Sequence, residues 1–259
     1  MSFDVAGDSY GRFMGRFSEP LADEFADTLA LQRGQRALDV GCGPGALTAR
    51  LVDALGAEAV SAVDPSAPFV AAARQRFVNV DVREASAEQL PYDDGTFDVT
   101  AAELVVHFMV DPVAGMREMA RVTRVGGLVA ACVWDFGSRR DPLAVFWAAV
   151  RRLDPTAHDE SDEPGVVEGQ LVSYFEAAGL VDVRGSRLPI EVPIGTFDEW
   201  WTPFTLGVGP AGAYVAGLDD GERARLRDEC ARELGDHDIH ISASAWSATG
   251  RVSTGQAGA

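Results

Sequence analysis

Glycines and an acidic residue have the types and spacing of a site that binds a nucleoside. Gly41, Gly43 and Gly45 alternate directly after the apolar residues 37–40, and a helical pattern follows them. Glycine permits a sharp turn and close approach of a ligand because it carries no Cβ atom. The first turn of the following helix would present unpaired N–H groups to an acceptor-rich ligand. The segment therefore predicts a strand, a tight turn and a helix around a ligand.

Asp64 is the candidate partner of a ribose. It ends a second apolar segment, residues 59–63. Its distance from the glycine turn is close to the roughly 20 residues at which an acidic side chain accepts hydrogen bonds from ribose hydroxyls. A turn or helix N-cap role is the alternative, because Pro65 and Ser66 follow. The spacing favours ribose binding.

Candidate proton-transfer groups follow two further predicted strands. Glu103 and His107 come after residues 97–102, and Asp135 comes after residues 128–133. Open α/β sheets bind ligands at the carboxyl ends of their strands. A general base there would help if the reacting group were a hydroxyl or an acidic carbon. Packing or hydrogen bonding is the alternative role for each residue, so His107 and Asp135 are candidate bases only.

Alternating apolar strands and amphipathic helices predict a doubly wound α/β fold with a mostly parallel sheet. We expect a single domain in which residues 1–32 form a helical flap, 33–136 the ligand-binding core, and 137–259 lid insertions and final strands. Residues 9–30 suggest two helical segments, the second beginning near Ser18. Residues 159–164 suggest a solvated acidic loop, and residues 207–212 a glycine-rich bend.

The amino-acid composition excludes several kinds of catalytic chemistry and disfavours some classes of partner. The chain has 259 residues and a net charge of −18, which disfavours nucleic acid as a partner. All 22 basic residues are arginines, so lysine Schiff bases and P-loop lysines are excluded. Three widely spaced cysteines suggest neither disulfides nor a zinc site. No apolar run has membrane-spanning length and no signal peptide is recognisable, so we expect a cytoplasmic protein, as a monomer or homodimer.

Together these motifs resemble the class I S-adenosylmethionine (SAM)-dependent methyltransferases. The similarity is to the small-molecule branch, methyltransferase type 11, that includes quinone-biosynthesis methyltransferases. It covers most of the chain. The matching segments are residues 38–45, Val63 to Ser66, Leu90-Pro91-Tyr92 with Phe97-Asp98, residues 117–122 with Gly126-Gly127, the N-terminal residues 10–18, and residues 245–250.

The resemblance implies a Rossmann-like, seven-stranded sheet whose last strand runs antiparallel, and SAM as methyl donor, leaving S-adenosylhomocysteine. It places Asp39 and the turn at the amino-acid end of SAM, Asp64 at the ribose, Ser86 and Ala87 at the adenine, and Glu103 and Leu104 beside the sulfonium. The family often has aspartate where Ser86 stands, which leaves a serine hydroxyl for that contact. Arg16 could pair with the SAM carboxylate. The full set of predicted cofactor-binding residues is Tyr10, Arg16, Ser18, Asp39, Gly41, Cys42, Gly43, Asp64, Pro65, Ser86, Ala87, Glu103 and Leu104.

The predicted acceptor is a small, apolar or aromatic molecule, because aromatic residues gather in the segments that would cover the site. These residues are Trp134, Phe136, Trp147, Trp200, Trp201 and Phe204. They could instead form the hydrophobic core of the lid. Two other functions stay open: an NAD(P)-dependent oxidoreductase, because Gly41 to Ala46 fits a loose dinucleotide fingerprint, and a non-catalytic SAM-binding protein.

Overall fold

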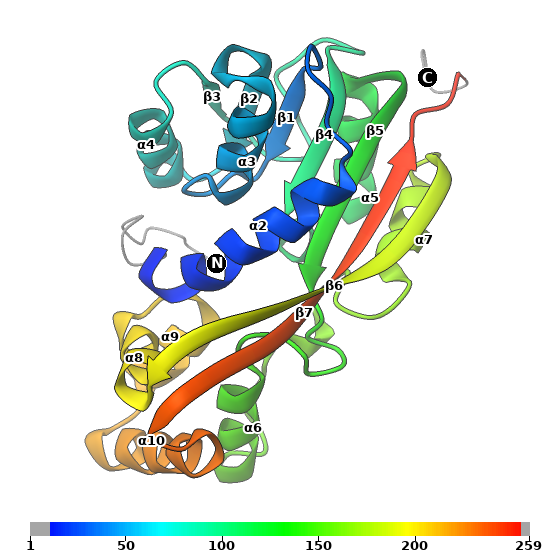
Figure 1. Cartoon of the computed structure of the whole chain (residues 1–259). Coiled ribbons are helices and arrows are strands. Elements are labelled where there is room, and N and C mark those ends of the chain that lie inside the picture. Colours follow the sequence, from blue (N-terminus) through cyan, green and yellow to red (C-terminus); the bar gives the residue numbers. More distant parts are fainter. Residues whose placement is uncertain (1–10, 255–259) are drawn as a thin grey trace.

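The computed structural model describes residues 11–254, and its centre is one seven-stranded sheet in the order β3-β2-β1-β4-β5-β7-β6 (Figure 1). Strands β1 to β5 pair in parallel, and β7 is antiparallel to both of its neighbours. This confirms the predicted Rossmann-like sheet with a reversed last strand. The strands are β1 (Ala37–Val40), β2 (Val60–Asp64), β3 (Asp81–Glu84), β4 (Phe97–Glu103), β5 (Thr123–Trp134), β6 (Val181–Thr196) and β7 (His237–Arg251).

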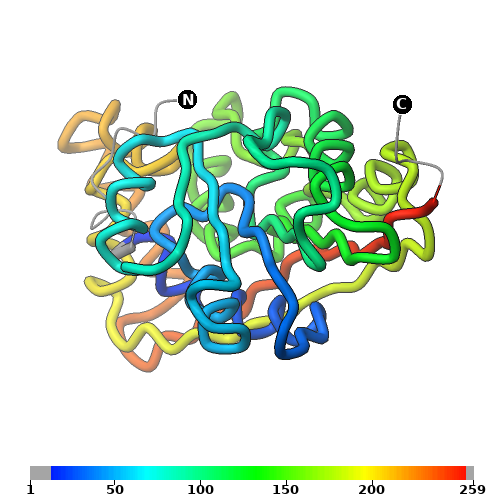
Figure 2. The backbone as a smooth tube through the Cα atoms, turned by 90° about the horizontal axis from the view of Figure 1, so that it is seen from above, coloured from blue at the N-terminus to red at the C-terminus, as the bar shows by residue number. Residues whose placement is uncertain are grey.

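Helices connect the strands and cover the sheet. Figure 2 shows α3, in blue, and α5, in green, on opposite sides of it. The α-helices are α2 (Arg16–Thr28), α3 (Ala46–Leu55), α4 (Ala67–Arg76), α5 (Pro112–Val122), α6 (Ala144–Leu153), α7 (Gln170–Ala177), α8 (Phe197–Trp201), α9 (Gly209–Gly217) and α10 (Asp220–Leu234). A π-helical turn, η1 (Gly11–Gly15), precedes α2, and short 3₁₀ turns are η2 (Ala57–Ala59), η3 (Val106–Phe108), η4 (Glu160–Asp162) and η5 (Thr202–Leu206).

The central strands are short and apolar because both of their faces are covered. Every residue of β1 and β2 is buried, as are most residues of β4. In parallel sheets such continuous burial follows from crossover helices that pack on both faces. The same connection places the end of each central strand, with the loop after it, at one edge of the sheet. Asp39, Asp64 and Glu103 lie in the last part of three of these strands.

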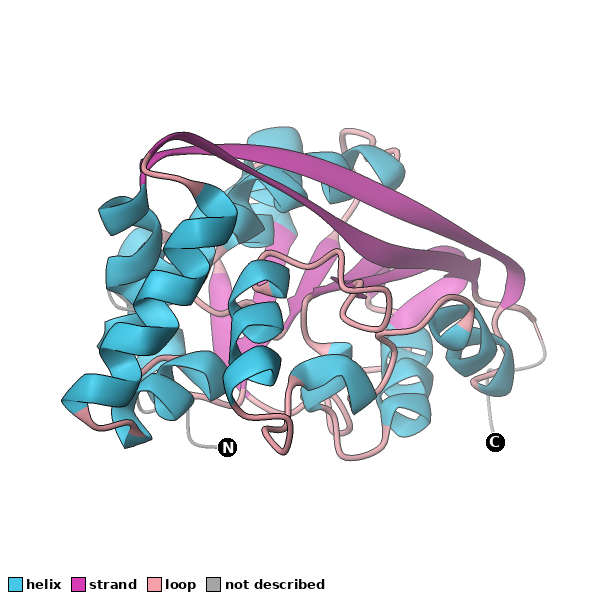
Figure 3. Ribbon diagram, turned by 90° about the horizontal axis from the view of Figure 1, so that it is seen from below, coloured by secondary structure: helices cyan, strands magenta, loops and turns pink. Residues whose placement is uncertain are grey.

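The two last strands of the sheet extend past its parallel part. β6 and β7 pair from Val181 opposite Arg251 to Thr196 opposite His237. In Figure 3 they form a long curved ribbon with helices along one side. Helices α6, α8, α9 and α10 gather at the far end of this ribbon (Figure 1). The ribbon thereby carries a helical group beyond the carboxyl edge of the parallel strands, and the lid predicted from the sequence contains these helices.

Two local predictions were wrong, and one helix start is shifted by two residues. Helix α2 follows η1 and begins at Arg16, two residues before Ser18. Pro20 is its fifth residue, beyond the first four positions whose N–H groups lack a helical partner, so it removes one backbone hydrogen bond from the helix. The glycine-rich bend is largely helix, since α9 begins at Gly209. The predicted solvated loop at residues 159–164 contains a buried side chain, because Glu160 is only 7% exposed.

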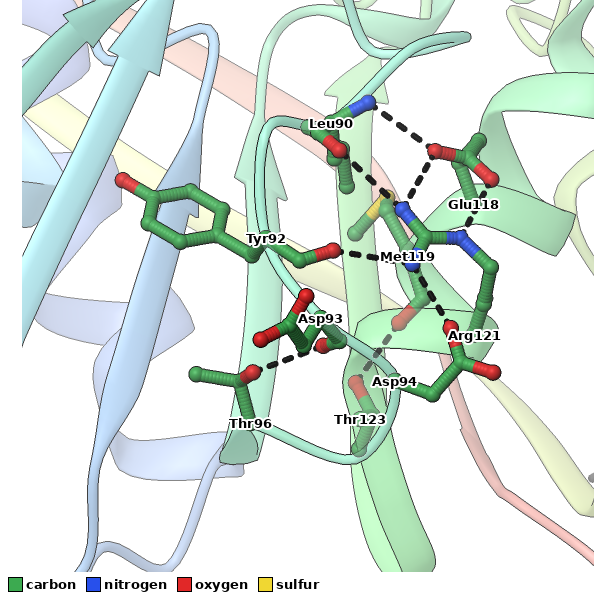
Figure 4. A network of polar contacts seen from close by, with 9 residues as sticks. All are labelled: Leu90, Tyr92, Asp93, Asp94, Thr96, Glu118, Met119, Arg121 and Thr123. Carbon is green, nitrogen blue, oxygen red and sulfur yellow. Dashed lines mark hydrogen bonds and ion pairs between the residues drawn. The ribbon is translucent and has the colours of Figure 1, made fainter.

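Arg121 organises the loop before β4 through a network of polar contacts (Figure 4). Its Nε and Nη2 donate to the two carboxylate oxygens of Glu118 at 2.7 and 2.9 Å, and its Nη1 donates to Asp94 at 2.8 Å. The guanidinium also donates to the backbone oxygens of Leu90 and Tyr92 at 3.0 and 2.8 Å. The N–H of Leu90 donates to Glu118 at 2.9 Å. Five hydrogen-bond donors of one side chain therefore hold the Leu90-Pro91-Tyr92 loop against α5.

We predict that Arg121→Ala lowers the free energy of unfolding by about 2 kcal/mol, because two backbone carbonyls and a carboxylate lose a charged donor. Chemical denaturation measures this loss. Arg117→Ala is the matched control on the same helix, since the side chain of Arg117 makes a single hydrogen bond within residues 11–254, an exposed one to the Ala177 oxygen at 3.2 Å. Equal losses in the two variants would contradict the structural role given to Arg121.

Candidate functional site

The glycine turn between β1 and α3 has a backbone that side chains would obstruct. Gly41, Gly43 and Gly45 have φ values of +72°, +51° and +96°. A Cβ at Gly41 would lie 2.4 Å from Cγ2 of Val105, and one at Gly45 would lie 2.3 Å from Cε2 of Phe77. A Cβ at Gly43 would meet nothing within 4 Å. Two glycines are therefore required for packing, whereas Gly43 faces open space.

Asp64 holds this turn in place. Its Oδ2 accepts a hydrogen bond from the N–H of Gly43 at 2.9 Å, and its Oδ1 accepts one from Ser66 at 2.8 Å. The N–H groups of Gly41 and Cys42 donate to the Val63 oxygen at 2.7 and 2.9 Å. Burial raises the pKa of Asp64, and the two backbone hydrogen bonds act in the opposite direction. The predicted ribose partner is thus also the clamp between the turn and the loop after β2.

Two further carboxyls are buried at this edge and are incompletely paired. Asp39 accepts a hydrogen bond from Thr48 Oγ1 at 2.5 Å, but its Oδ1 has no partner. Oε1 of Glu103 also has none among the described residues. Burial raises the pKa of Asp39 to about 7, and burial followed by the charge of Asp39 raises the pKa of Glu103 well above its usual value. A cationic ligand group would offset the cost of these buried carboxylates.

Gly41, Gly43, Asp64 and Glu103 line a common pocket, which we call the turn pocket. Its lining contains no arginine within the described part of the chain, so a ligand there meets acidic and apolar groups. The lining residues are Ser18, Gly41, Cys42, Gly43, Pro44, Ala46, Asp64, Pro65, Ser66, Phe69, Glu103, Leu104, Val105 and Phe108. Eight of the predicted cofactor-binding residues are therefore brought together: Ser18, Gly41, Cys42, Gly43, Asp64, Pro65, Glu103 and Leu104.

The other predicted cofactor-binding residues lie elsewhere. Tyr10 is outside the described residues. Asp39 is buried beneath the turn, where only 1% of it is exposed. Arg16 does not line the pocket, because its Nη1 donates to the Glu199 backbone oxygen at 2.9 Å. Ser86 and Ala87 follow β3 and are also absent from the lining.

A second pocket, the aromatic pocket, adjoins the first. The two share Leu104 and Phe108. Leu104 has a φ of +59°, a conformation that costs a non-glycine residue of order 1 kcal/mol and is often found at functional sites. The lining of the aromatic pocket comprises Phe13, Met14, Leu104, His107, Phe108, Trp134, Phe136, Leu143, Glu160, Glu163, Val208, Gly209, Pro210 and Ala211.

His107 and Asp135, the two candidate bases, have different surroundings. His107 lines the aromatic pocket, and burial lowers its pKa to about 3, so its ring is neutral at neutral pH. Its Nδ1 has no hydrogen-bond partner among the described residues. Asp135 lines neither pocket. Its carboxylate accepts hydrogen bonds from Trp246 Nε1 at 3.0 Å and from the Ser138 N–H at 3.1 Å. These contacts tie the end of β5 to β7.

The aromatic residues divide between the pocket and the lid core. Trp134 and Phe136 line the aromatic pocket. Trp200 and Phe204 pack against each other with ring centroids 4.7 Å apart. Phe204 also stacks on Phe146 at 4.5 Å. Trp147 and Trp201 contact rings of the same group. Both sequence interpretations therefore hold, each for a different subset of the rings.

Sequence reasoning missed several lining residues. Glu160 lay in a segment assigned to solvent, and Val208 to Ala211 lay in the supposed bend. Phe13 and Met14 reach the pocket from η1, far away in the sequence. Only the aromatic and arginine-rich pattern of residues 10–18 hinted at such a flap.

Within residues 11–254 no helix is both long and apolar enough to cross a membrane, and no cluster of side chains could hold a metal ion.

The stability of two glycine variants tests which glycine of the turn is required for packing. Gly41→Ala should lower the free energy of unfolding by about 3 kcal/mol, from the positive φ and the clash with Val105. Gly43→Ala should cost about 1 kcal/mol, from its positive φ alone. Chemical denaturation of both variants measures the difference. A loss for Gly43→Ala equal to that for Gly41→Ala would contradict the open space described at Gly43.

Comparison with known proteins identifies the sequence relatives. A family model described as "Methyltransferase domain" matches residues 38–131. A demethylmenaquinone methyltransferase of Mycobacterium sp. (strain KMS) is 37% identical over 178 residues, which cover 64% of this chain and 76% of the relative. A chloroplastic 2-methyl-6-phytyl-1,4-hydroquinone methyltransferase of Oryza sativa is 29% identical over 67% of this chain. The chain spans about half the length of that relative, 50%.

Solved structures share the fold. A putative methyltransferase complexed with the Trm112 methyltransferase activator of Haloferax volcanii matches with a TM-score of 0.61 and 18% identity. The match covers 95% of this chain and 94% of the other. At this level of identity the similarity concerns the fold alone.

Proposed function

Because the chain belongs to the class I SAM-dependent methyltransferase family, we propose that it transfers the methyl group of SAM to a small apolar or aromatic acceptor. The observation that carries this proposal is the adjacency of the two pockets. One is acidic and built on a glycine turn, the other is mainly apolar, and they meet at Leu104 and Phe108. The relatives named for hydroquinone and demethylmenaquinone methylation support an acceptor of this kind.

The turn pocket fits SAM on the chemistry of its residues. Asp39 and Glu103 carry unpaired buried oxygens, and SAM offers an ammonium group and a sulfonium that suit them. Gly43 leaves open space where the ligand backbone would approach. Asp64 would accept hydrogen bonds from the ribose hydroxyls with its remaining lone pairs. When bound, SAM supplies an electrophilic methyl group.

In the proposed reaction the protein acts mainly through positioning. Holding an acceptor in line with the methyl group supplies much of the acceleration of a displacement. The aromatic pocket would hold the acceptor and exclude water from the junction at Leu104. We propose that His107 contacts the acceptor as a neutral imidazole, since its low pKa makes it a weak base. Asp135 would act indirectly, by fixing the end of β5 through its contact with Trp246.

Further proposals concern the division of the chain into parts, its location in the cell and its oligomeric state. We propose that residues 1–32 act as a flap, 33–136 as the SAM-binding core and 137–259 as the lid with the final strands. A cytoplasmic location and a monomeric or homodimeric state remain proposals as well. An NAD(P)-dependent oxidoreductase is disfavoured, because the pyrophosphate of a dinucleotide would meet the buried carboxyls of Asp39 and Glu103.

Calorimetric titration tests donor recognition. SAM should bind and NADH should not, and Asp64→Ala should weaken SAM binding at least tenfold because both the ribose contacts and the clamp on Gly43 are lost. Asp162→Asn is a charge-matched control outside both pockets and should bind SAM with unchanged affinity. An unchanged dissociation constant in Asp64→Ala would remove the ribose role, and NADH binding without SAM binding would refute the family activity.

Labelled SAM then tests transfer. Incubation of the protein with phenols, hydroquinones and amines should give a methylated product of at least one apolar acceptor. SAM binding with no transfer to any member of the panel would support the non-catalytic alternative, a SAM-binding protein.

SAM affinity should depend on pH through Asp39. This carboxyl has a pKa of about 7 in the free protein and must be charged to attract a cation. Raising the pH from 6 to 8 therefore deprotonates it and should strengthen binding several-fold. Titrations across this range measure the change, and Asp39→Asn should flatten it while leaving an amide oxygen to accept from Thr48. Affinity that falls with rising pH would contradict this assignment.

A further inference from the structure

The aromatic pocket contains buried polar atoms without a hydrogen bond of good geometry, although the Trp147 side chain approaches Glu160 closely enough to lower its pKa. Glu160 is 7% exposed, and its Oε2 has no hydrogen-bond partner among the described residues. Nδ1 of His107 and Nε1 of Trp134, in the same lining, are likewise unpartnered. Burial of such a group without a partner is unfavourable, because the group loses its hydrogen bonds to water and gains none in return. The pocket is therefore incomplete without a ligand that carries a polar group.

The charges around Glu160 are acidic. Glu163 lines the same pocket, and Asp141 is 5% exposed and raises the pKa of Glu160 through its charge. The nearby basic group is already engaged, because Arg151 forms an ion pair with Asp159. Burial, reinforced by Asp141, raises the pKa of Glu160 to about 8. Glu163 and Asp141 would repel a negatively charged ligand group, and the described lining of the pocket contains no arginine to attract one.

The geometry points to the class of acceptor. We infer that the aromatic pocket binds an apolar molecule whose polar end donates a hydrogen bond to Glu160, through a hydroxyl or an ammonium group. Acceptors with a carboxylate or a phosphate at that end are disfavoured by the acidic groups Glu163 and Asp141. The inference rests on the proposed function in one respect, since it treats this pocket as the acceptor site. In this assignment Glu160 positions the acceptor and determines which acceptors bind. The assignment does not specify which atom is methylated.

Binding of small aromatic probes without a methyl donor tests the inference. Calorimetry would compare 4-ethylphenol, its methyl ether 4-ethylanisole, 4-ethylbenzoate and 4-methylbenzylamine. At least one donor-bearing probe, the phenol or the amine, should bind at least tenfold more tightly than the ether, and the benzoate should not bind measurably. Equal affinity for the phenol, the amine and the ether, measurable benzoate binding, or binding of none of the four would overturn the inference.

Variants assign the preference to Glu160. Glu160→Leu keeps a side chain of similar size without an acceptor and should abolish the preference for a donor over the ether. Asp162→Asn removes one charge from the same turn at an exposed position outside the pocket, and should retain the preference within twofold. A preference that survives in Glu160→Leu would overturn the role of Glu160. The comparison of the four probes uses the wild-type protein alone. Misfolding of Glu160→Leu would therefore leave that test of the inference in place.

Proton exchange distinguishes the two kinds of donor. The charges of Asp141 and Asp159 raise the pKa of Glu160, Glu163 lines the same pocket, and Arg151 is paired with Asp159, so Glu160 is largely protonated at pH 7. An ammonium group should ionise it and release up to one proton, measured from binding heats in two buffers of different ionisation enthalpy. A hydroxyl should release none. Amine binding without proton release, and unchanged in Glu160→Leu, would contradict the contact.

The proposed function and this inference can fail separately. SAM affinity is measured in the same variants, and Glu160→Leu should bind SAM within threefold of wild type because Glu160 does not line the turn pocket. Donor-selective probe binding without methyl transfer would support the inference and refute the proposed function. Methyl transfer to an acceptor that carries an anion at its polar end would do the reverse.

Discussion

Burial of carboxyl groups at the carboxyl edge of a parallel sheet is the constraint on which this structure depends. Asp39, Asp64 and Glu103 are each at most 9% exposed, and none forms an ion pair within the described residues. Burial disfavours their charged forms and raises their pKa values. Hydrogen bonds from backbone N–H groups or a hydroxyl to some of these oxygens reduce the cost of burying the carboxyl groups. The remaining unpaired oxygens favour binding of a positively charged ligand.

The rest of the fold follows from keeping that edge in place. Asp64 bridges the glycine turn and the loop after β2, so the loops after two neighbouring strands are held by one carboxylate. Arg121 holds the loop before β4 against α5 on the other side of the sheet. The β6–β7 ribbon then carries helices α6, α8, α9 and α10 beyond the edge. Together these contacts give a rigid acidic pocket beside an apolar one whose walls come from distant segments.

The two pockets differ in how they recognise a ligand. The turn pocket uses backbone shape and two acidic residues, Asp64 at the end of β2 and Glu103 at the end of β4. The aromatic pocket uses rings for its walls and Glu160 for its polar contact. A shared boundary at Leu104 and Phe108 lets a group bound in one approach a group bound in the other. The unusual backbone of Leu104 at this boundary is consistent with a functional constraint rather than with packing alone.

The sequence by itself determined the sheet, the turn and eight of the residues that line the turn pocket. Strand periodicity, glycine spacing and the acidic residue after β2 are local patterns, and the topology of a doubly wound fold brings strand ends to one edge. Only the tertiary structure decided the aromatic pocket. Phe13, Glu160 and Val208 meet there although they are far apart in the sequence. An acidic turn such as residues 159–164 has the composition of a solvated loop, and only Glu160 within it is buried. No local sequence pattern predicts the burial of Glu160, so only the tertiary structure identified it as a pocket residue.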